Sequence, residues 1–312
     1  GQRLADRYEV LREEGRGGMG VVYLGRDHVL ERDVALKMIS RDAVSEETRV
    51  RFLREARMIA RLDHPNIVPV YDLGEHEGGV FLVMPFIRGT TLRPLIRERR
   101  LTVLEVVDIA VQAAAALEHS HASAIVHRDV KPENFMLERR GQDLRVRLTD
   151  FGVALARNEQ KITSTGALMG TVAYLSPEQV RGDAIDERVD IYALATVIYE
   201  CLTGDTPFTG DVHGQLYRIV YEPHRPLSVV LEGIDAELDS IVSACLAKEP
   251  QLRIGSAGEL RERLERCRQN LQRGKEEGAL PTVRVVERAY LSPGTPLVGR
   301  ERELAVLCRR LD

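Results

Sequence analysis

Eight consecutive residues near the middle of the chain combine a carboxylate, cations and an amide in one short segment. The segment runs from His127 to Asn134, and Asp150 follows sixteen residues later in the tripeptide Asp-Phe-Gly. Phosphoryl transfer needs a proton acceptor, a fixed cation and two oxygen ligands for a divalent metal, because its transition state spreads negative charge that must be neutralised. The spacing therefore indicates phosphoryl-transfer chemistry, with Asp129 and Lys131 among its candidates.

Glycines, a lysine and a glutamate supply a second set of candidates. Gly15, Gly17 and Gly20 lie between two β-branched runs, where backbone amides can approach a triphosphate closely. These glycines alone are equally compatible with a hairpin that binds nothing. Lys37 lies on the next apolar run and Glu55 eighteen residues later, and each alone is compatible with an ordinary surface position. Taken together, they favour a phosphate-contacting lysine oriented by a carboxylate.

The elements that must position these residues change character along the chain. Short β-branched runs separated by Gly or charged turns predict a small, mostly antiparallel sheet before position 86. Apolar residues at three- and four-residue spacing predict one helix inserted in that sheet, and helical periodicity dominates after Gly89. The predicted strands cover 8–12, 21–25, 34–39, 67–73 and 80–86, and the predicted helices cover 45–63, 103–121, 186–202 and 234–246.

Composition excludes several other classes of protein. The 44 Lys and Arg against 48 Asp and Glu give a net charge of −4, so no global positive field would attract nucleic acid or anionic lipid. The four Cys are scattered, without CxxC spacing or His partners at zinc-site intervals, so no disulfide framework or structural metal is predicted. No apolar run has the length of a signal-peptide core or a membrane helix. We therefore expect a cytoplasmic protein without a nucleic-acid partner and without a membrane segment in this chain.

The motifs together resemble the eukaryotic-like protein kinases, and among them the bacterial Hanks-type Ser/Thr class. The glycine segment reads Gly-Gly-Met-Gly over 17–20, as is common in that class, and Ser-Pro-Glu-Gln over 176–179 follows the Asp-Phe-Gly motif. The glycine loop, strand lysine, helix glutamate, His-Arg-Asp and Asp-Phe-Gly occur in the family's order. The resemblance implies an α+β, bilobal protein-kinase fold, with a small β-rich N-lobe that carries one key helix and a larger, mostly helical C-lobe.

The resemblance also sets the expected domain boundaries. Gly and Pro residues after Asn270 predict a linker over 271–295. The segment 296–312 contains Val-Gly-Arg-Glu before an apolar-periodic stretch and is similar to the start of AAA-like and STAND signalling ATPases, which would make this chain the kinase portion of a larger regulator. The alternative for 296–312 is an exposed, charged terminal helix. The kinase domain is expected over 1–270, with its N-lobe over about 8–86, its hinge at 85–88 and its C-lobe over about 89–270.

For the catalytic residues, the resemblance implies specific roles. Asp129 would be the base that accepts the proton of the substrate hydroxyl, and Lys131 would stabilise the transferring phosphoryl group. Thr171 would bond to both of these residues. Lys37 would contact the α- and β-phosphates of ATP and pair with Glu55.

The resemblance likewise implies how ATP and its metal would be held. Asn134 and Asp150 would hold Mg²⁺, with Mn²⁺ as the alternative metal. Val22, Ala35 and Met136 would sandwich the adenine, and Met84 would be the gatekeeper. The backbone of the hinge would hydrogen-bond the adenine edge. The full predicted nucleotide set is Gly15, Gly17, Gly20, Val22, Ala35, Lys37, Met84, Pro85, Ile87 and Met136.

Supporting residues follow from the same resemblance. Asp190 would anchor the backbone of the catalytic loop from within the C-lobe. Glu178 and Arg253 would form a buried ion pair, which is costly to break from one side. An apolar stack that links the lobes is expected from His127, Phe151, Ile59 and Val70.

Regulation is predicted from the arginine before the catalytic aspartate. Arg128 occupies the place found in kinases that are switched on by phosphorylation of the activation loop, and an unpaired guanidinium there needs an anion. Thr163 and Thr165 are the candidate phosphorylation sites, and Ser164 is a weaker one. The alternative is that this segment is simply a polar loop.

The predicted function is that of a Ser/Thr protein kinase, which transfers the ATP γ-phosphoryl group to protein hydroxyls. It is also expected to phosphorylate its own activation loop, with one subunit of a homodimer acting on the other. Lys131 and the Gly-Thr pair at 170–171 are typical of Ser/Thr rather than tyrosine kinases. The alternative is a nucleotide-binding pseudokinase scaffold, which Glu14 keeps open because the family usually has Leu or Ile there. A small-molecule kinase of related fold is disfavoured by the complete Ser-Pro-Glu segment.

Overall fold

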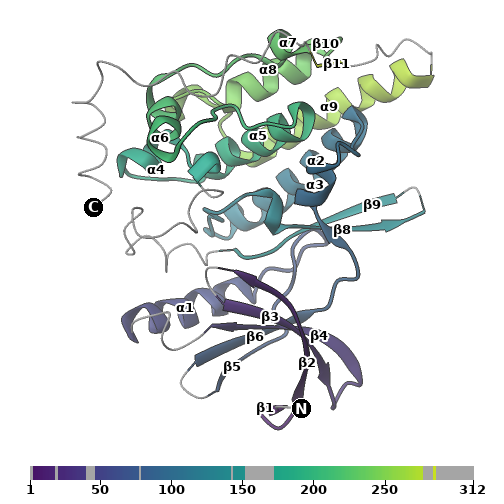
Figure 1. Cartoon of the computed structure of the whole chain (residues 1–312), viewed down its shortest axis with the longest axis vertical. Helices are drawn as coiled ribbons and strands as arrows, with labels where there is room; N and C mark the ends of the chain where they lie inside the picture. The colour runs from purple at the N-terminus through teal and green to yellow at the C-terminus, as the bar shows by residue number, and fades with distance from the viewer. Residues whose placement is uncertain are drawn as a thin grey trace.

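The computed structural model describes residues 3–17, 20–39, 46–76, 79–141, 143–151, 172–276 and 284–285. These residues form a β-rich N-lobe and a mostly helical C-lobe, which lie one above the other in Figure 1. The predicted α+β, bilobal architecture is therefore confirmed. The N-lobe consists of β1 (Arg3–Leu4), β2 (Tyr8–Gly17), β3 (Gly20–Asp27), β4 (Arg32–Ile39), α1 (Glu46–Ile59), β5 (Asp72–His76) and β6 (Gly79–Pro85).

The N-lobe strands form one antiparallel sheet in the order β1-β2-β3-β4-β6-β5. Side chains alternate between its faces along each strand. On β4, Val34 and Leu36 pack into the apolar cluster of one face, whereas Ile39 packs toward α1 on the other. Lys37 is two residues before Ile39 on the same strand, so both side chains lie on the face that α1 covers.

One predicted strand is shifted in the structure. The prediction placed it over 67–73, but β5 begins at Asp72, and Ile67 makes only an isolated parallel bridge to Leu148. Pro69 lacks the N–H that a regular ladder needs, which explains why this segment stays extended without pairing continuously. The predicted helix over 45–63 is present as α1, with its last residue at Ile59.

The C-lobe is built around two long helices. The segments α3 (Val103–Ala122) and α5 (Arg188–Thr203) pack against each other, and 13 of the 16 residues of α5 are buried, as expected of a helix surrounded by protein. The other C-lobe elements are β7 (Thr90–Thr91), α2 (Leu92–Arg97), η2 (Pro132–Asn134), β8 (Phe135–Arg140), β9 (Asp143–Leu148), η5 (Val172–Tyr174), α4 (Pro177–Arg181), α6 (Val212–Tyr221), α7 (Leu227–Val230), β10 (Leu231–Glu232), α8 (Ala236–Cys245), η6 (Pro250–Leu252) and α9 (Ala257–Glu276).

Helix boundaries in the C-lobe follow local sequence signals. Thr102 precedes α3 and forms a capping box, in which its hydroxyl accepts from the Glu105 N–H and the Glu105 carboxylate accepts from the Thr102 N–H. Gly204 ends α5 with φ at 88°, a conformation that favours glycine. The three helices predicted for this lobe are all present, with ends that differ from the prediction by one or two residues.

The end of the folded domain differs from the expected boundary at Asn270. Helix α9 continues through that position to Glu276, and Leu271 is buried against the C-lobe core. Further along, β11 (Arg284–Val285) pairs antiparallel with β10, at the top right of Figure 1. Described parts of the predicted linker are thus helix and strand that pack on the C-lobe. Among the described helices, none is long and apolar enough to cross a membrane.

Candidate active site

A buried carboxylate at the start of α5 fixes the backbone of the catalytic loop. Asp190 accepts hydrogen bonds from the backbone N–H of His127 at 2.8 Å and of Arg128 at 2.7 Å, and His121 Nε2 lies 2.8 Å from its Oδ2. Arg128 has a φ of 66°, which is not a strand or helix conformation, so its backbone N–H cannot find a partner in regular secondary structure and bonds to a side chain instead. The predicted anchoring role of Asp190 is confirmed by these contacts.

Two groups of the same loop hold Asp129, a cation at its carboxylate and an amide at its backbone carbonyl. Lys131 Nζ donates to Asp129 Oδ2 at 2.7 Å, and Asn134 Nδ2 donates to the Asp129 carbonyl at 2.7 Å. The Asp129 and Lys131 side chains keep 14% and 15% of their surfaces exposed. The carboxylate is therefore oriented and accessible at the same time.

Asp150 connects the two lobes through the strand lysine. Lys37 Nζ donates to Asp150 Oδ1 at 2.6 Å, although the two residues are 113 positions apart. Burial raises the pKa of Asp150, but attraction to the Lys37 ammonium and the hydrogen bond outweigh it, so the pKa lies below its usual value. Thr149, the preceding residue, donates its N–H to the Asn134 carbonyl at 3.0 Å, which ties this segment to the catalytic loop.

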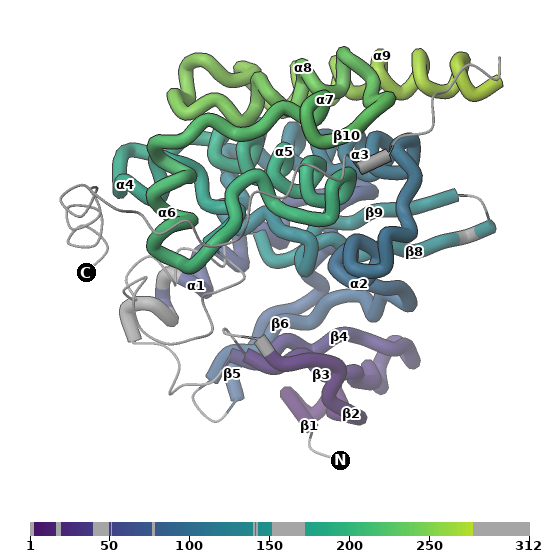
Figure 2. Tube along the Cα trace, turned by 45° about the horizontal axis from the view of Figure 1, so that its top comes forward, coloured from purple at the N-terminus to yellow at the C-terminus, as the bar shows by residue number. Residues whose placement is uncertain are grey.

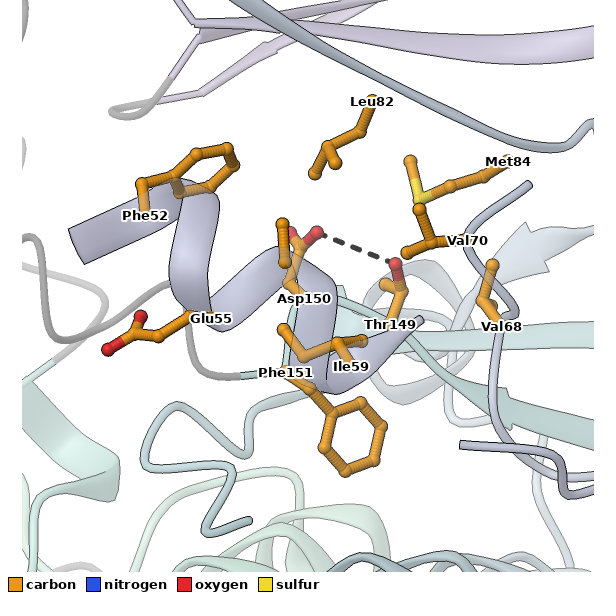
Figure 3. A pocket seen from close by; sticks show the side chains of 11 residues that line it. Phe52, Glu55, Ile59, Val68, Val70, Leu82, Met84, Thr149, Asp150 and Phe151 are labelled. Atoms are coloured by element: carbon orange, nitrogen blue, oxygen red, sulfur yellow. Dashed lines mark hydrogen bonds between the residues drawn. The ribbon is translucent and has the colours of Figure 1, made fainter. Parts of the chain in front are cut away.

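The predicted pairing of Lys37 with Glu55 is not the contact that the structure contains. Among the described residues, the carboxylate at ion-pair distance from Lys37 is that of Asp150. Figure 3 shows the Glu55 carboxylate on α1 pointing away from Asp150, although Glu55 is buried. The packing of α1 therefore leaves Lys37 paired with Asp150 rather than with Glu55.

The glycine segment includes the last residue of β2, Gly17, and the first residue of β3, Gly20. Gly20 has a φ of 147°, and a Cβ at this position would lie 2.0 Å from the Met38 carbonyl oxygen, so only glycine fits. Gly15 and Gly17 pair in register with Val22 and Gly20. Gly18 and Met19 lie outside the described residues.

The remaining predicted nucleotide positions lie on neighbouring strands. Val22 pairs in register with Lys37 on β4, and Ala35 pairs with Met84 on β6. These strands bring residues from three parts of the sequence to one side of the sheet. Pro85 is the last residue of β6, Ile87 follows it in the connection to the C-lobe, and Met136 lies on β8.

Apolar residues line a small cavity between α1 and the sheet. His127 and Phe151 are in ring contact, with centroids 4.4 Å apart, which confirms that part of the predicted stack. Phe151, Ile59 and Val70 line a cavity of about 20 Å³ that also borders Met84. Figure 3 shows these side chains around it. Such a cavity has room for about one water molecule.

Several predicted residues lie outside the described part of the chain. They are Gly152, Thr163, Ser164, Thr165, Thr171 and the segment 296–312. Arg128, by contrast, is described, and its Nε and Nη1 are buried with no hydrogen-bond partner among the described residues. The geometry agrees with the expectation of an unpaired guanidinium beside the active site.

The predicted buried ion pair between Glu178 and Arg253 is confirmed. Arg253 Nη1 and Nη2 donate to the two Glu178 oxygens at 2.6 and 2.7 Å, and both side chains are buried. A second charged cluster was not predicted from the sequence. It centres on Arg93 of α2, whose guanidinium contacts Glu133 and Glu200. Glu133 lies within the catalytic-loop motif, but no local pattern connects it to an arginine forty positions earlier.

Comparison with known proteins decides the family. A sequence model described as the protein kinase domain matches residues 8–264. The chain belongs to the protein kinase domain family. Its N-lobe and C-lobe, as described above, are those of this family.

Relatives with curated sequences are bacterial serine/threonine-protein kinases. PknB of Mycobacterium tuberculosis is 43% identical over 272 residues, which cover 84% of this chain and 43% of that protein. PknJ of the same organism is 38% identical over 257 residues, covering 81% of this chain and 44% of PknJ. The chain thus spans less than half the length of these relatives.

A solved structure agrees with the fold. The crystal structure of a double mutant of the Mycobacterium tuberculosis PknI kinase domain is 31% identical to this chain, with a TM-score of 0.68. The match covers 86% of this chain and 98% of the PknI chain. The kinase domain of this protein is therefore of the bacterial Hanks type, with Ser/Thr kinases as its relatives.

Proposed function

We propose that this chain transfers the γ-phosphoryl group of ATP to serine or threonine hydroxyls of proteins. The observation that carries the proposal is the geometry around Asp129, whose carboxylate is held by Lys131 in a loop that the buried Asp190 fixes. A preorganised acceptor and a fixed cation at one accessible point are what the reaction requires. The serine/threonine kinases among the relatives support the same activity.

Each residue of the site has a role in this proposal. Asp129 accepts the proton of the substrate hydroxyl, and Lys131 stabilises the charge on the group in transfer. Lys37 binds the α- and β-phosphates when ATP is present. Thr171, which lies outside the described residues, is proposed to bond to Asp129 and Lys131.

The residues present fit ATP and its divalent metal. The Asn134 amide nitrogen is engaged with the Asp129 carbonyl, so its oxygen is the atom left for a cation, and the Asp150 carboxylate supplies another oxygen. Two protein oxygens suffice, because Mg²⁺ in such sites completes its shell with phosphate oxygens and water. At Gly15 nothing lies within 4 Å of where a Cβ would be, so the β2 backbone there is open to an approaching phosphate. ATP supplies the transferred group, and Mg²⁺, or Mn²⁺ in its place, neutralises the phosphate charge.

A pseudokinase scaffold is the alternative that Glu14 suggests. In the structure, Glu14 is exposed and its Oε1 accepts from Arg12 Nε at 2.7 Å, so its charge has a partner. An exposed, paired carboxylate gives no reason to expect impaired nucleotide binding. The complete set of catalytic groups favours the enzyme.

The proposed activity is tested by incubating the protein with labelled ATP, Mg²⁺ and an unstructured Ser- and Thr-rich protein. We expect label on phosphoserine and phosphothreonine, and a loss of about 10²- to 10⁴-fold in rate for Asp129→Asn with nucleotide binding retained. Lack of incorporation at every enzyme concentration, together with a thermal shift on adding ATP, would establish the scaffold instead.

We also propose that the enzyme phosphorylates itself in the activation loop, in a homodimer that acts in trans. Arg128 supports this, because its buried guanidinium nitrogens have no partner among the described residues and a phosphate would supply three acceptor oxygens. Thr163 and Thr165 are the proposed sites, with Ser164 as the weaker one. Mass spectrometry after incubation with ATP tests the sites, and full activity of a Thr163→Ala, Thr165→Ala double variant would refute phosphorylation-dependent activation.

The segment after the kinase domain is proposed to connect it to an ATPase module in a larger regulator. The proposal rests on the Val-Gly-Arg-Glu motif within 296–312 and on relatives more than twice as long as the matched region. Its test is the sequence that follows in the full-length gene. A glycine-rich phosphate loop soon after position 312 supports the module, and a stop codon there contradicts it.

A further inference from the structure

Two histidines from distant parts of the chain stack on each other beside the end of α1. His64 lies in the connection that follows α1, and His119 lies on α3 of the C-lobe. Their ring centroids are 5.2 Å apart, with an interplanar angle of 28°. Both residues are half-buried, and His64 borders a surface cavity of about 660 Å³, which gives solvent protons access to the ring. A titratable contact therefore joins the N-lobe helix to the C-lobe.

His64 also acts as a hydrogen-bond acceptor within its own connection. The backbone N–H of Asn66 donates to His64 Nδ1 at 3.2 Å. A neutral imidazole accepts at one of its nitrogens, whereas a protonated imidazole carries an N–H at both. Protonation of His64 would therefore set two N–H groups against each other and would remove the acceptor of the Asn66 amide.

Asn66 ties the same connection to two elements of the C-lobe. Its Nδ2 donates to Gln112 Oε1 on α3 at 2.9 Å and to the Val146 carbonyl on β9 at 2.7 Å. Its carbonyl oxygen accepts from the Leu148 N–H at 2.8 Å. Leu148 is the last residue of β9, and Asp150 follows two residues later. The turn around Asn66 thus connects the end of α1 to the segment that carries Asp150.

Apolar side chains on both sides of this turn are anchored in the C-lobe. Leu62 and Ile67 are buried in the same core cluster as residues of α3, and Ile59, the last residue of α1, packs against that cluster. The placement of α1 on the C-lobe therefore depends on this connection. Because α1 covers the sheet face that carries Lys37, a change here reaches the phosphate-binding side of the site.

The surroundings of His64 favour its neutral form. Burial lowers the pKa of His64 below its ordinary value of 6.5, and repulsion from His119 lowers it further. The other titratable groups around the ring come from its own connection, α3 and β9, and they are Asp63, Tyr71, Glu118, Arg145 and Arg147. The two carboxylates raise the pKa, but one is exposed and the other is paired with Arg261 at 2.7 Å, and the two arginines of β9 oppose protonation.

We propose that the His64–His119 stack is a proton-sensitive contact that regulates the site: it holds the end of α1 against the C-lobe while His64 is neutral and releases it when His64 is protonated. The inference rests on the proposed kinase function, because it concerns the regulation of the same site. His64 acts through Asn66 rather than on the reacting atoms, so it is a positioning residue.

The sign of the pH effect follows from the neutral ring in the folded protein. Because the folded-state pKa of His64 is depressed, the stabilisation by this contact is complete above about pH 6.5 and is lost as the pH falls through the folded-state pKa. Acidification should therefore lower both the stability of the protein and its kcat.

The first test compares pH profiles of kcat, at saturating ATP and Mg²⁺, between the unaltered protein and His64→Asn. An Asn side chain still accepts from the amide two residues on, but it does not titrate. We expect the ratio of kcat at pH 7.5 to kcat at pH 5.5 to be about threefold or more larger in the unaltered protein than in His64→Asn. His213→Asn, which replaces an exposed histidine of α6, is the matched control and should keep the unaltered profile.

A second variant, His119→Phe, should move the acid limb of the profile in a defined direction. Phenylalanine keeps a ring for the stack but removes the repulsion, so the pKa of His64 should rise and the acid limb should move to higher pH. NMR titration of the His64 imidazole measures the pKa directly. An unmoved or lowered pKa in His119→Phe overturns the inference, and so does a kcat profile that is the same in the unaltered protein and in His64→Asn.

Urea unfolding over the same pH range separates this inference from the proposed function. Between pH 7.5 and pH 5.5 the unfolding midpoint of the unaltered protein should fall further than that of His64→Asn. If the unaltered protein phosphorylates no substrate, the proposed function fails, and the midpoints and the NMR titration still decide whether the contact is proton-sensitive. Midpoints that fall in parallel in the two proteins overturn the inference.

Discussion

The catalytic loop and helix α1 differ in how their charged groups meet their predicted partners. In the C-lobe, Asp190 bonds the loop backbone and Glu178 pairs with Arg253, both as the family resemblance implied. In the N-lobe, Lys37 contacts Asp150 across the lobes, and Glu55 on α1 points elsewhere.

The difference follows from how each element is packed. The C-lobe partners all lie on or against α5, which is surrounded by protein, so their positions are fixed by burial. Helix α1 packs through one apolar side, with Phe52 and Ala56 against the sheet, and a small cavity remains beside it. Figure 2 shows α1 at the edge of the molecule, in contrast to α5. We infer that the C-lobe fixes the loop of the proposed proton acceptor Asp129, whereas the packing of α1 leaves Lys37 paired with Asp150 rather than with Glu55.

The largest effect is expected from removing the N-lobe contact between Lys37 and Asp150. Lys37→Met should lower the rate of phosphoryl transfer by about 10²- to 10³-fold, because it removes a preorganised cation from the phosphates. It should also raise the pKa of Asp150, since the attraction that outweighs burial is lost. Titration of the Asp150 carboxyl by NMR measures the second effect. Glu55→Gln is the control, and an equal rise in that variant would mean that Glu55 is coupled to the pair.

In the C-lobe, the corresponding change removes one partner of the buried Glu178–Arg253 ion pair. Glu178→Ala should cost about 3–5 kcal/mol of unfolding free energy, because it leaves the Arg253 charge buried without compensation. Denaturant unfolding measures the loss. Arg100→Ala, which breaks an exposed pair with Glu98, should cost less than about 1 kcal/mol. A Glu178→Leu, Arg253→Met double variant should recover part of the loss, and failure to do so would contradict this explanation.

A smaller effect is expected from pH in the N-lobe. Hydrogen bonds from Arg7 lower the pKa of Asp27 from 3.8 to about 2, and backbone N–H groups of Val29 and Leu30 add to this. Because the folded-state pKa is depressed, the stabilisation is complete above about pH 4 and is lost as the pH falls toward 2. Asp27→Asn should therefore cost about 1–2 kcal/mol at neutral pH and progressively less below pH 4. Urea unfolding at several pH values checks this, and a cost independent of pH would contradict it.

The smallest effect concerns the departure from the family pattern before the glycine loop. Glu14→Leu should change the dissociation constant of ATP less than twofold, because Glu14 is exposed and paired with Arg12. Equilibrium binding of a fluorescent ATP analogue measures it. A tenfold gain in affinity would show instead that position 14 covers the nucleotide.

Much of the fold was predictable because its signals are local. The apolar runs of β4 and β6 and the helical spacing over 103–121 follow from which side chains must be buried, and the structure contains these elements near the predicted bounds. The shifted strand at 67–73 and the extension of α9 beyond Asn270 were not predictable in the same way. Helix α9 continues because the C-lobe core, which is distant in the sequence, buries Leu271, whereas in 67–73 Pro69 interrupts regular pairing and Ile67 makes only an isolated bridge to Leu148.

The sequence by itself determined the types and order of the reactive groups, since a motif such as 127–134 specifies carboxylate, cation and amide within one loop. Only the tertiary structure decided which charges meet at Lys37 and at Arg93. Lys37 and Asp150 are 113 positions apart, and Arg93 lies 40 positions before Glu133 and 107 before Glu200. Ion pairs form between whichever opposite charges the packed backbone brings within a few ångströms, and no local periodicity records that distance.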